Sequence, residues 1–364
     1  MAAALWAARA GTVERAVHTR HLRTLWWLPG TRLGVVSWPA GWRERLFLVW
    51  HYWWQAHLMD CLLDAQLRAP LAPRRYLLES LARGIRLRNL TGWTNDYYDD
   101  IAWLGLALQR AAETAGVHRP GELRVIVDQL RSGWSAHGGG GIWWRIGDDF
   151  KNVPANGSAA ILLARLGRDA PADLERAVDI TEWITAQLVD PDTGLVWDGL
   201  RVNPDGSVRE TEKAVYSYNQ GVYLGACVEL AAATGDEVWL QRAAYTVSAV
   251  REHLTDEHGV LRRHDGGDGG LFSGILTRYL ALAAVGLPAD QTATKQAAAH
   301  LVMVSAEAAW RYRNIGIGGP VFGSEWSVPS APPPAGPRDL SVQLSGWMLC
   351  EAAAFIERRA PSLA

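Results

Sequence analysis

The stretch RERLFLVWHYWWQAHLMDCLLDAQLR, residues 43–68, indicates the class of fold. Its large apolar side chains recur at helical spacing, and together with one histidine they are Leu46, Phe47, Trp50, Trp53, Trp54, His57, Leu58 and Cys61. One turn of an α-helix holds about 3.6 residues, so this spacing gathers the side chains on one face. The stretch therefore predicts an amphipathic helix that packs into a core.

Similar helical patterns follow one another along the rest of the chain. They predict helices at roughly 3–21, 75–89, 95–115, 120–133, 155–167, 172–188, 212–233, 236–254, 269–286, 291–311 and 340–357, with no convincing strand pattern between them. About twelve helices form six helical hairpins, which an α/α toroid accommodates as an inner and an outer ring. An open α-solenoid would need a sequence repeat of fixed period, and we find none. We expect one all-α domain over residues 1–364, with the proline-rich stretch 329–337 as a surface loop.

The composition narrows the class of partner. Charged residues make up 20% of the chain and the net charge is -2, which gives no electrostatic argument for binding nucleic acid. The chain holds 19 tryptophans, which either fill a core or stack on sugar rings. Its three cysteines lie far apart without a CxxC motif, so we expect buried free thiols rather than disulfides or a zinc site.

The chain start and its apolar runs bear on localisation. The first residues lack a basic start and a long apolar stretch, so they make a poor signal peptide. The most apolar run, Leu46 to Trp54, falls well short of the roughly 18 residues that a membrane span needs. We expect a cytoplasmic protein without a membrane span, and a monomer.

The stretch NDYYDDIAW, residues 95–103, contains two adjacent carboxylates. Thr94 or Asn95 is a suitable helix N-cap, which places Asp99 and Asp100 in the first turns of a helix. Successive helical residues point about 100° apart, so both side chains can reach one cleft. The helix macrodipole alone also favours acidic residues at this position, so the pair by itself has a purely structural explanation.

The aromatic surroundings of this pair favour catalysis. Carboxylates among aromatic rings are partly desolvated, which favours the protonated form of one of them. Glycoside hydrolysis requires one ionised and one protonated carboxyl group side by side. The neighbouring aromatic residues are Trp93, Tyr97, Tyr98 and Trp103.

The stretch GGGGIWWRIGDDFKNVPANG, residues 138–157, is a candidate binding loop. It lacks the GxxxxGK[ST] pattern of a phosphate-binding loop, so we interpret it as a flexible loop that presents Trp143 and Trp144. Asn152 and Asn156 near the next helix start either bind sugar hydroxyls or cap the helix.

A third segment, YSYNQGVYLG at residues 216–225, offers polar side chains for a sugar. Tyr218 and Asn219 are donors and acceptors for hydroxyl groups, with core hydrogen bonding as the alternative. Asp198, which follows Trp197 upstream, is a candidate third carboxylate beside an indole platform.

Taken together, these segments resemble glycoside hydrolase family 76, the endo-α-1,6-mannanases. The motifs occur in order over about residues 45 to 355 and make the resemblance specific. They are WHYWWQAH (50–57), NDYYDDIAW (95–103), GGIWWR (140–145), FKNVPANG (150–157), YNQG (218–221), FSGI (272–275), FGSEWS (322–327) and QLSG (343–346).

The resemblance implies an (α/α)6 barrel and retaining hydrolysis of α-1,6-mannosidic bonds in mannan or manno-oligosaccharides, without metal or cofactor. It implies Asp99 as the nucleophile and Asp100 as the general acid/base, the division of roles that the residues alone do not give. Residues expected to line the cleft are Trp143, Trp144, Asn152, Asn156, Asp198, Tyr218 and Asn219. Two other functions stay open: a sugar epimerase on the same barrel, which would need cleft histidines, and a non-catalytic glycan-binding protein.

Overall fold

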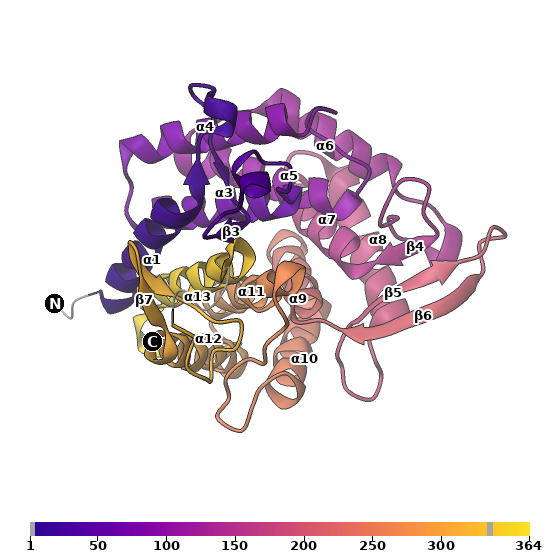
Figure 1. Ribbon diagram of the computed structural model, residues 1–364. Coiled ribbons are helices and arrows are strands. Elements are labelled where there is room, and N and C mark those ends of the chain that lie inside the picture. The colour runs from indigo at the N-terminus through magenta and orange to yellow at the C-terminus, as the bar shows by residue number, and fades with distance from the viewer. Residues whose placement is uncertain (1–3, 333–337) are drawn as a thin grey trace.

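The structure is a computed structural model that describes residues 4–332 and 338–364. Within these residues, twelve long α-helices alternate between an outer and an inner ring (Figure 1). The outer helices are α1 (Leu5–His21), α4 (Ala72–Arg88), α6 (Pro120–Ser132), α8 (Pro171–Leu188), α10 (Glu237–His253) and α12 (Thr292–Tyr312). The inner helices are α3 (Tyr52–Arg68), α5 (Tyr98–Ala115), α7 (Val153–Leu166), α9 (Ser217–Thr234), α11 (Phe272–Gly286) and α13 (Leu340–Arg359).

The inner ring is closed, because each inner helix packs against the next and α13 packs against α3. Burial follows from this arrangement: α7 buries twelve of its 14 residues, whereas α10 buries six of 17 on one stripe. The predicted (α/α)6 barrel is therefore confirmed. The stretch Gly267–Gly286 is long and apolar enough to span a membrane by composition, but 67% of its most apolar window is buried in the barrel.

The N-terminal prediction of one helix over residues 43–68 is wrong in its first half. A single turn, α2 (Trp42–Arg45), is followed by an irregular segment, and α3 begins only at Tyr52. Phe47 and His51 adopt left-handed backbone conformations with φ of 54° and 44°, which a continuing helix does not allow. This irregular segment lies directly before the inner helix.

Short strands, which the sequence did not reveal, connect the helices. A three-stranded antiparallel sheet consists of β4 (Phe150–Asn152), β5 (Trp197–Val202) and β6 (Val208–Val215), and the β5–β6 hairpin projects beyond the helices (Figure 1). The helix predicted from residue 212 therefore begins at Ser217. Because β6 is largely exposed, it lacks the apolar alternation that marks a half-buried strand. Two-stranded pairs are β1–β2 (Leu22–Arg23, Leu33–Gly34), β3–β9 (Ser37–Trp38, Arg338–Asp339) and β7–β8 (Asn314–Gly316, Gly319–Val321).

Four inner helices hold the preceding connection with the same device. A buried amide at the fourth residue of the helix accepts a hydrogen bond from one backbone N–H and donates to the C=O of the same residue, at 2.6 to 3.1 Å. This fixes the loops at the end of the barrel where the inner helices begin, since buried backbone groups need partners. The pairs are Gln55 with Gly34, Asn156 with Ile142, Gln220 with Val196, and Gln343 with Phe322.

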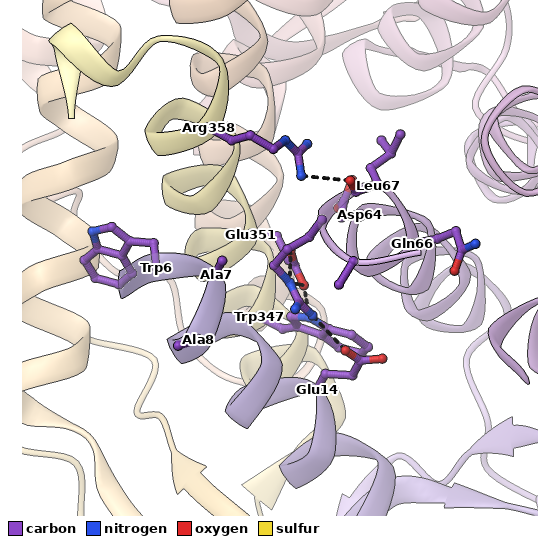
Figure 2. Close-up of polar contacts among 12 residues, drawn as sticks. Trp6, Ala7, Ala8, Glu14, Asp64, Gln66, Leu67, Trp347, Glu351 and Arg358 are labelled. Atoms are coloured by element: carbon purple, nitrogen blue, oxygen red, sulfur yellow. Dashed lines mark hydrogen bonds and ion pairs between the residues drawn. The ribbon is translucent and has the colours of Figure 1, made fainter. Parts of the chain in front are cut away.

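The opposite end of the barrel is held by buried ion pairs. Arg68 of α3 donates to Glu351 of α13 at 3.0 Å and to Glu14 of α1 at 2.7 Å, and Trp347 donates to Glu351 at 2.9 Å (Figure 2). Burial raises the pKa of Glu351 to about 7. The three cysteines are free and buried, as predicted.

A cavity of about 290 Å³ lies at this opposite end. Arg110 and Arg278 on its wall each pair with both Asp60 and Asp64. Burial alone would raise the pKa of Asp60, but the two guanidinium charges outweigh burial and hold it below its usual value. Asp60 is thus held ionised as a counter-ion and is unsuited to deliver a proton. The two adjacent carboxylates Asp99 and Asp100 lie at the other end, where the inner helices begin.

Candidate active site

Asp99 and Asp100 lie in the first turn of α5, where the sequence places them. The residue that caps α5 is Tyr97, rather than Thr94 or Asn95, and its side chain makes no capping hydrogen bond. Asn95 acts differently: its amide donates to Oδ2 of Asp100 at 2.6 Å and its oxygen accepts from the backbone N–H of Tyr97. The turn before the helix thus orients one carboxylate of the pair.

The two carboxyl groups have unequal environments. Burial raises the pKa of Asp99 to about 7, although the backbone N–H of Asp100 and the indole N–H of Trp144 both donate to it, at 2.9 and 3.1 Å, and favour its charged form. Burial together with the neighbouring charge of Asp99 raises the pKa of Asp100 well above its usual value. Both side chains remain partly accessible to solvent. The pair therefore titrates as a unit in which Asp100 holds the proton longer.

A third carboxylate, Asp198 of β5, faces the same space. Its negative charge contributes to the raised pKa of Asp99, and burial raises its own pKa to about 6. Asn219 at the start of α9 donates to it at 3.0 Å and is itself fully buried. Asn219 therefore orients Asp198, and of the two side chains Asp198 is the one open to a ligand.

A fourth carboxylate, Asp268, comes from the 3-10 turn before α11. It accepts hydrogen bonds from the indoles of Trp53 and Trp54 on α3, at 3.1 and 2.8 Å. Its charge contributes to the raised pKa of Asp100. Sequence patterns did not single out Asp268, because its partners Trp53 and Trp54 lie far from it along the chain and only the fold brings them together.

Aromatic side chains lie close to these carboxylates. Tyr218 of α9 stacks on Phe272 of α11, with ring centroids 3.9 Å apart and planes at 4°. Burial, with the charges of Asp198 and Asp99 next, raises the pKa of Tyr218 well above its usual value, so its hydroxyl stays protonated. The ring of Trp53 lies 6.5 Å from that of Tyr218. Tyr218 therefore lies between Phe272 of α11 and Trp53 of α3.

The glycine-rich loop presents its two tryptophans to different partners. Trp144 donates to Asp99, and its ring meets that of Tyr97 edge-on at 5.3 Å. Trp143 packs its face on the ammonium of Lys151, 4.4 Å from the ring centroid. Only Trp144 of this pair contacts a candidate catalytic group directly.

The two predicted asparagines of α7 lie beneath this loop. Asn152 is the N-cap of α7 and accepts from the backbone N–H of Ala155, which is the capping alternative. Asn156 is fully buried, and its side-chain amide forms hydrogen bonds with the backbone of Ile142 and Asn152. The structure therefore places both in support of the loop and does not bring them to the open space beside Asp99.

The chain contains a second Asp-Asp dipeptide, which provides an internal comparison. Asp149 of the pair Asp148–Asp149 forms ion pairs with Arg209 and Arg201 at 2.7 Å, and hydrogen bonds from these arginines lower its pKa. Surface ion pairs of this kind hold a carboxylate ionised. Asp99 and Asp100 have the raised pKa values that acid catalysis requires, whereas the pKa of Asp149 is lowered.

The site as a whole suits a neutral polyhydroxylated ligand. Asp99, Asp100, Asp198 and Asp268 supply acceptors for hydroxyl groups, while the rings supply flat apolar faces. An anionic ligand would meet repulsion from these carboxylates. The unequal pair Asp99 and Asp100 can attack an electrophilic carbon and protonate a leaving oxygen.

Comparison with known proteins agrees with this geometry. A model of the family described as glycosyl hydrolase family 76 matches residues 12–362. The mannan endo-1,6-alpha-mannosidase DCW1 of Candida glabrata is 27% identical over 233 residues, which cover 55% of this chain and 50% of that relative. The chain thus spans about half the length of this curated relative.

Solved structures match over almost all of the chain. The α-1,6-mannanase of Salegentibacter sp. is 32% identical with a TM-score of 0.85, over 97% of this chain and 100% of that one. A second structure holds an inactive variant of that mannanase, with two consecutive aspartates replaced by asparagine, in complex with α-1,6-mannotriose. It is 31% identical, has a TM-score of 0.85 and covers the same shares of both chains.

Proposed function

Because the chain belongs to glycosyl hydrolase family 76, we propose that it is a retaining endo-acting hydrolase of α-1,6-mannosidic bonds in mannan or manno-oligosaccharides. The similar Salegentibacter mannanase supports this substrate, since its inactive variant binds α-1,6-mannotriose. That variant is inactive and carries asparagine at two consecutive aspartates, and we take Asp99 and Asp100 in the first turn of α5 as the equivalent pair.

The reaction proceeds in two displacements on Asp99 and Asp100. The Asp99 carboxylate attacks the anomeric carbon and forms a glycosyl ester, while the glycosidic C–O bond breaks and the leaving oxygen takes the proton of Asp100. Water then attacks the anomeric carbon, gives a proton to Asp100 and releases Asp99. Two inversions at one carbon restore the α configuration.

The different surroundings of the two carboxyl groups support these roles. Asp99 accepts two N–H donors that stabilise its negative charge, as a nucleophile requires. The charge of Asp99 adds to the effect of burial and raises the pKa of Asp100, which therefore keeps the proton that a general acid delivers. As Asp99 becomes esterified, its charge disappears and the pKa of Asp100 falls, which suits Asp100 to act as base in the second step.

We assign the surrounding residues to sugar binding. Asp198 and Tyr218 offer an acceptor and a donor at one side of the pair, and Trp144 at the other holds Asp99. Asn219 acts through Asp198 and Asn156 acts through the loop, so both are positioning residues, whereas Asn152 caps α7.

Incubation with linear α-1,6-mannan tests the proposal. We expect short oligosaccharides whose newly formed reducing ends are α at the earliest times by NMR. Asp99→Asn and Asp100→Asn should each lower kcat by a factor of about 100 or more, the scale of acid–base and nucleophilic contributions. The matched controls Asp148→Asn and Asp149→Asn in the second dipeptide should keep wild-type turnover.

The outcomes separate the alternatives. Wild-type turnover in both Asp99→Asn and Asp100→Asn would refute the assignment of the pair. Binding of mannotriose without cleavage by the wild-type chain would indicate a glycan-binding protein, and an altered sugar with unchanged chain length would indicate an epimerase.

A further inference from the structure

Lys151 of β4 carries a fully buried ammonium group in a cage of oxygen atoms. Its Nζ lies 2.7 to 2.9 Å from five oxygens of residues 135–141, at the start of the glycine-rich loop. They are the carbonyl oxygens of Ser135, His137, Gly140 and Gly141 and the hydroxyl oxygen of Ser135. The face of Trp143 covers a sixth side.

The charge of this ammonium has no acidic partner. Among the described residues, the hydrogen bonds and ion pairs of Lys151 include no carboxylate. Burial accordingly lowers its pKa to about 7. Buried charges are normally paired with an opposite charge. An ammonium that contacts neutral oxygens and an indole is therefore unusual.

The ammonium is one of several contacts that hold this loop. Gly138, Gly139, Gly140 and Gly141 all have positive φ, from 62° to 133°. The carbonyl groups of Gly140 and Gly141 point to the ammonium, whereas that of Gly138 accepts from the indole N–H of Trp183. Carbonyl dipoles that converge on one point repel each other unless a cation lies between them. The ammonium therefore bridges the carbonyl groups that surround it.

The same loop continues directly into the candidate active site. Trp143 lies on the ammonium, and the next residue, Trp144, donates its indole N–H to Asp99 at 3.1 Å. The backbone of Trp144 is also bonded to Tyr98 at the start of α5 and to Phe150, next to Lys151. A shift of the loop therefore moves the donor of the proposed nucleophile.

We propose that Lys151 is a positioning residue whose caged ammonium sets the place of Trp144 on Asp99, and that the five-oxygen cage is a site for a monovalent cation when the lysine side chain is removed. Ammonium and potassium ions are of similar size, and converging carbonyl oxygens replace the hydration shell of such ions. The catalytic half of this inference rests on the proposed function, whereas the cage itself does not.

Variants at this position separate charge from packing. Lys151→Ala opens the cage, and Lys151→Met fills it with an apolar chain of similar length. We expect kcat on α-1,6-mannan to fall about tenfold in both, the scale of losing one hydrogen bond to a charged group, with KM changed much less. Ammonium or potassium chloride at constant ionic strength should restore much of kcat in Lys151→Ala, but not in Lys151→Met. Lithium and tetramethylammonium chloride should restore it in neither.

Thermal unfolding in the same salts tests the cage independently of activity. The midpoint of Lys151→Ala should rise with ammonium or potassium relative to lithium, while the wild-type midpoint does not discriminate among them. If Lys151→Ala is unfolded in lithium chloride, ammonium should restore its circular dichroism spectrum. An inactive wild type would refute the proposed function and leave this thermal test valid. Wild-type kcat in Lys151→Met, or a Lys151→Ala variant indifferent to the cation in both assays, would overturn the inference.

Discussion

Replacement of Trp144 by phenylalanine removes an indole N–H from Asp99 and keeps an aromatic ring in the loop. The bond measures 3.1 Å and ends on a carboxylate oxygen. A hydrogen bond to a charged group contributes about 1.5–3 kcal/mol, and the partial exposure of Asp99 favours the lower end. One pKa unit corresponds to about 1.4 kcal/mol, so Trp144→Phe should raise the pKa of Asp99 by about one unit.

The sign of the effect on activity follows from the role of Asp99. A nucleophile must be ionised, and burial already raises the pKa of Asp99 to about 7. A further rise moves the acidic limb of the kcat/KM profile to higher pH by about one unit and lowers kcat/KM about tenfold at a pH below that limb. The limb reports the first macroscopic pKa of the coupled pair Asp99 and Asp100.

The assay is kcat/KM on α-1,6-mannan between pH 4 and 9, with the fold checked by circular dichroism. Trp42→Phe is the matched control, since Trp42 lies on α2 with 67% of its surface exposed and has no contact with Asp99. An unchanged acidic limb in a folded Trp144→Phe variant would refute the assignment of Asp99 as a nucleophile stabilised by this indole.

Two further expectations concern stability. Gln220→Leu leaves the N–H and C=O of Val196 without hydrogen-bond partners in the interior. The free energy of unfolding in urea should therefore fall by about 2–4 kcal/mol, against about 0.5 kcal/mol or less for the exposed control Gln296→Leu. Equal losses in the two variants would contradict this role of Gln220. Glu351 has a pKa raised from 4.5 to about 7, so the folded state binds its proton more tightly and this stabilisation is lost as pH rises between these values. Glu351→Gln should flatten the pH dependence of the urea midpoint in that window, and an identical slope in variant and wild type would argue against the burial effect.

The pattern of apolar residues predicted nearly all of the helices. Long inner helices such as α7 and α9 are recognisable because tertiary burial and helical spacing agree along them. The prediction was wrong at His51, where a positive φ interrupts the helical pattern, and in the exposed hairpin strand β6. A left-handed residue leaves no mark on apolar spacing, and an exposed strand carries no alternation, so neither has a signal in one sequence.

Some features of the candidate site likewise follow from the sequence, and others only from the tertiary structure. The sequence alone determined that two adjacent carboxylates stand at a helix start among aromatic residues, because that depends on neighbours along the chain. The closed ring decided the rest: it brought Asp198 and Asp268 from distant segments to that pair, and it placed Asn156 under a loop. The raised pKa values, the opposite behaviour of the dipeptide at 148–149 and the caged ammonium of Lys151 all depend on burial and on charges distant in sequence, which only the tertiary structure sets.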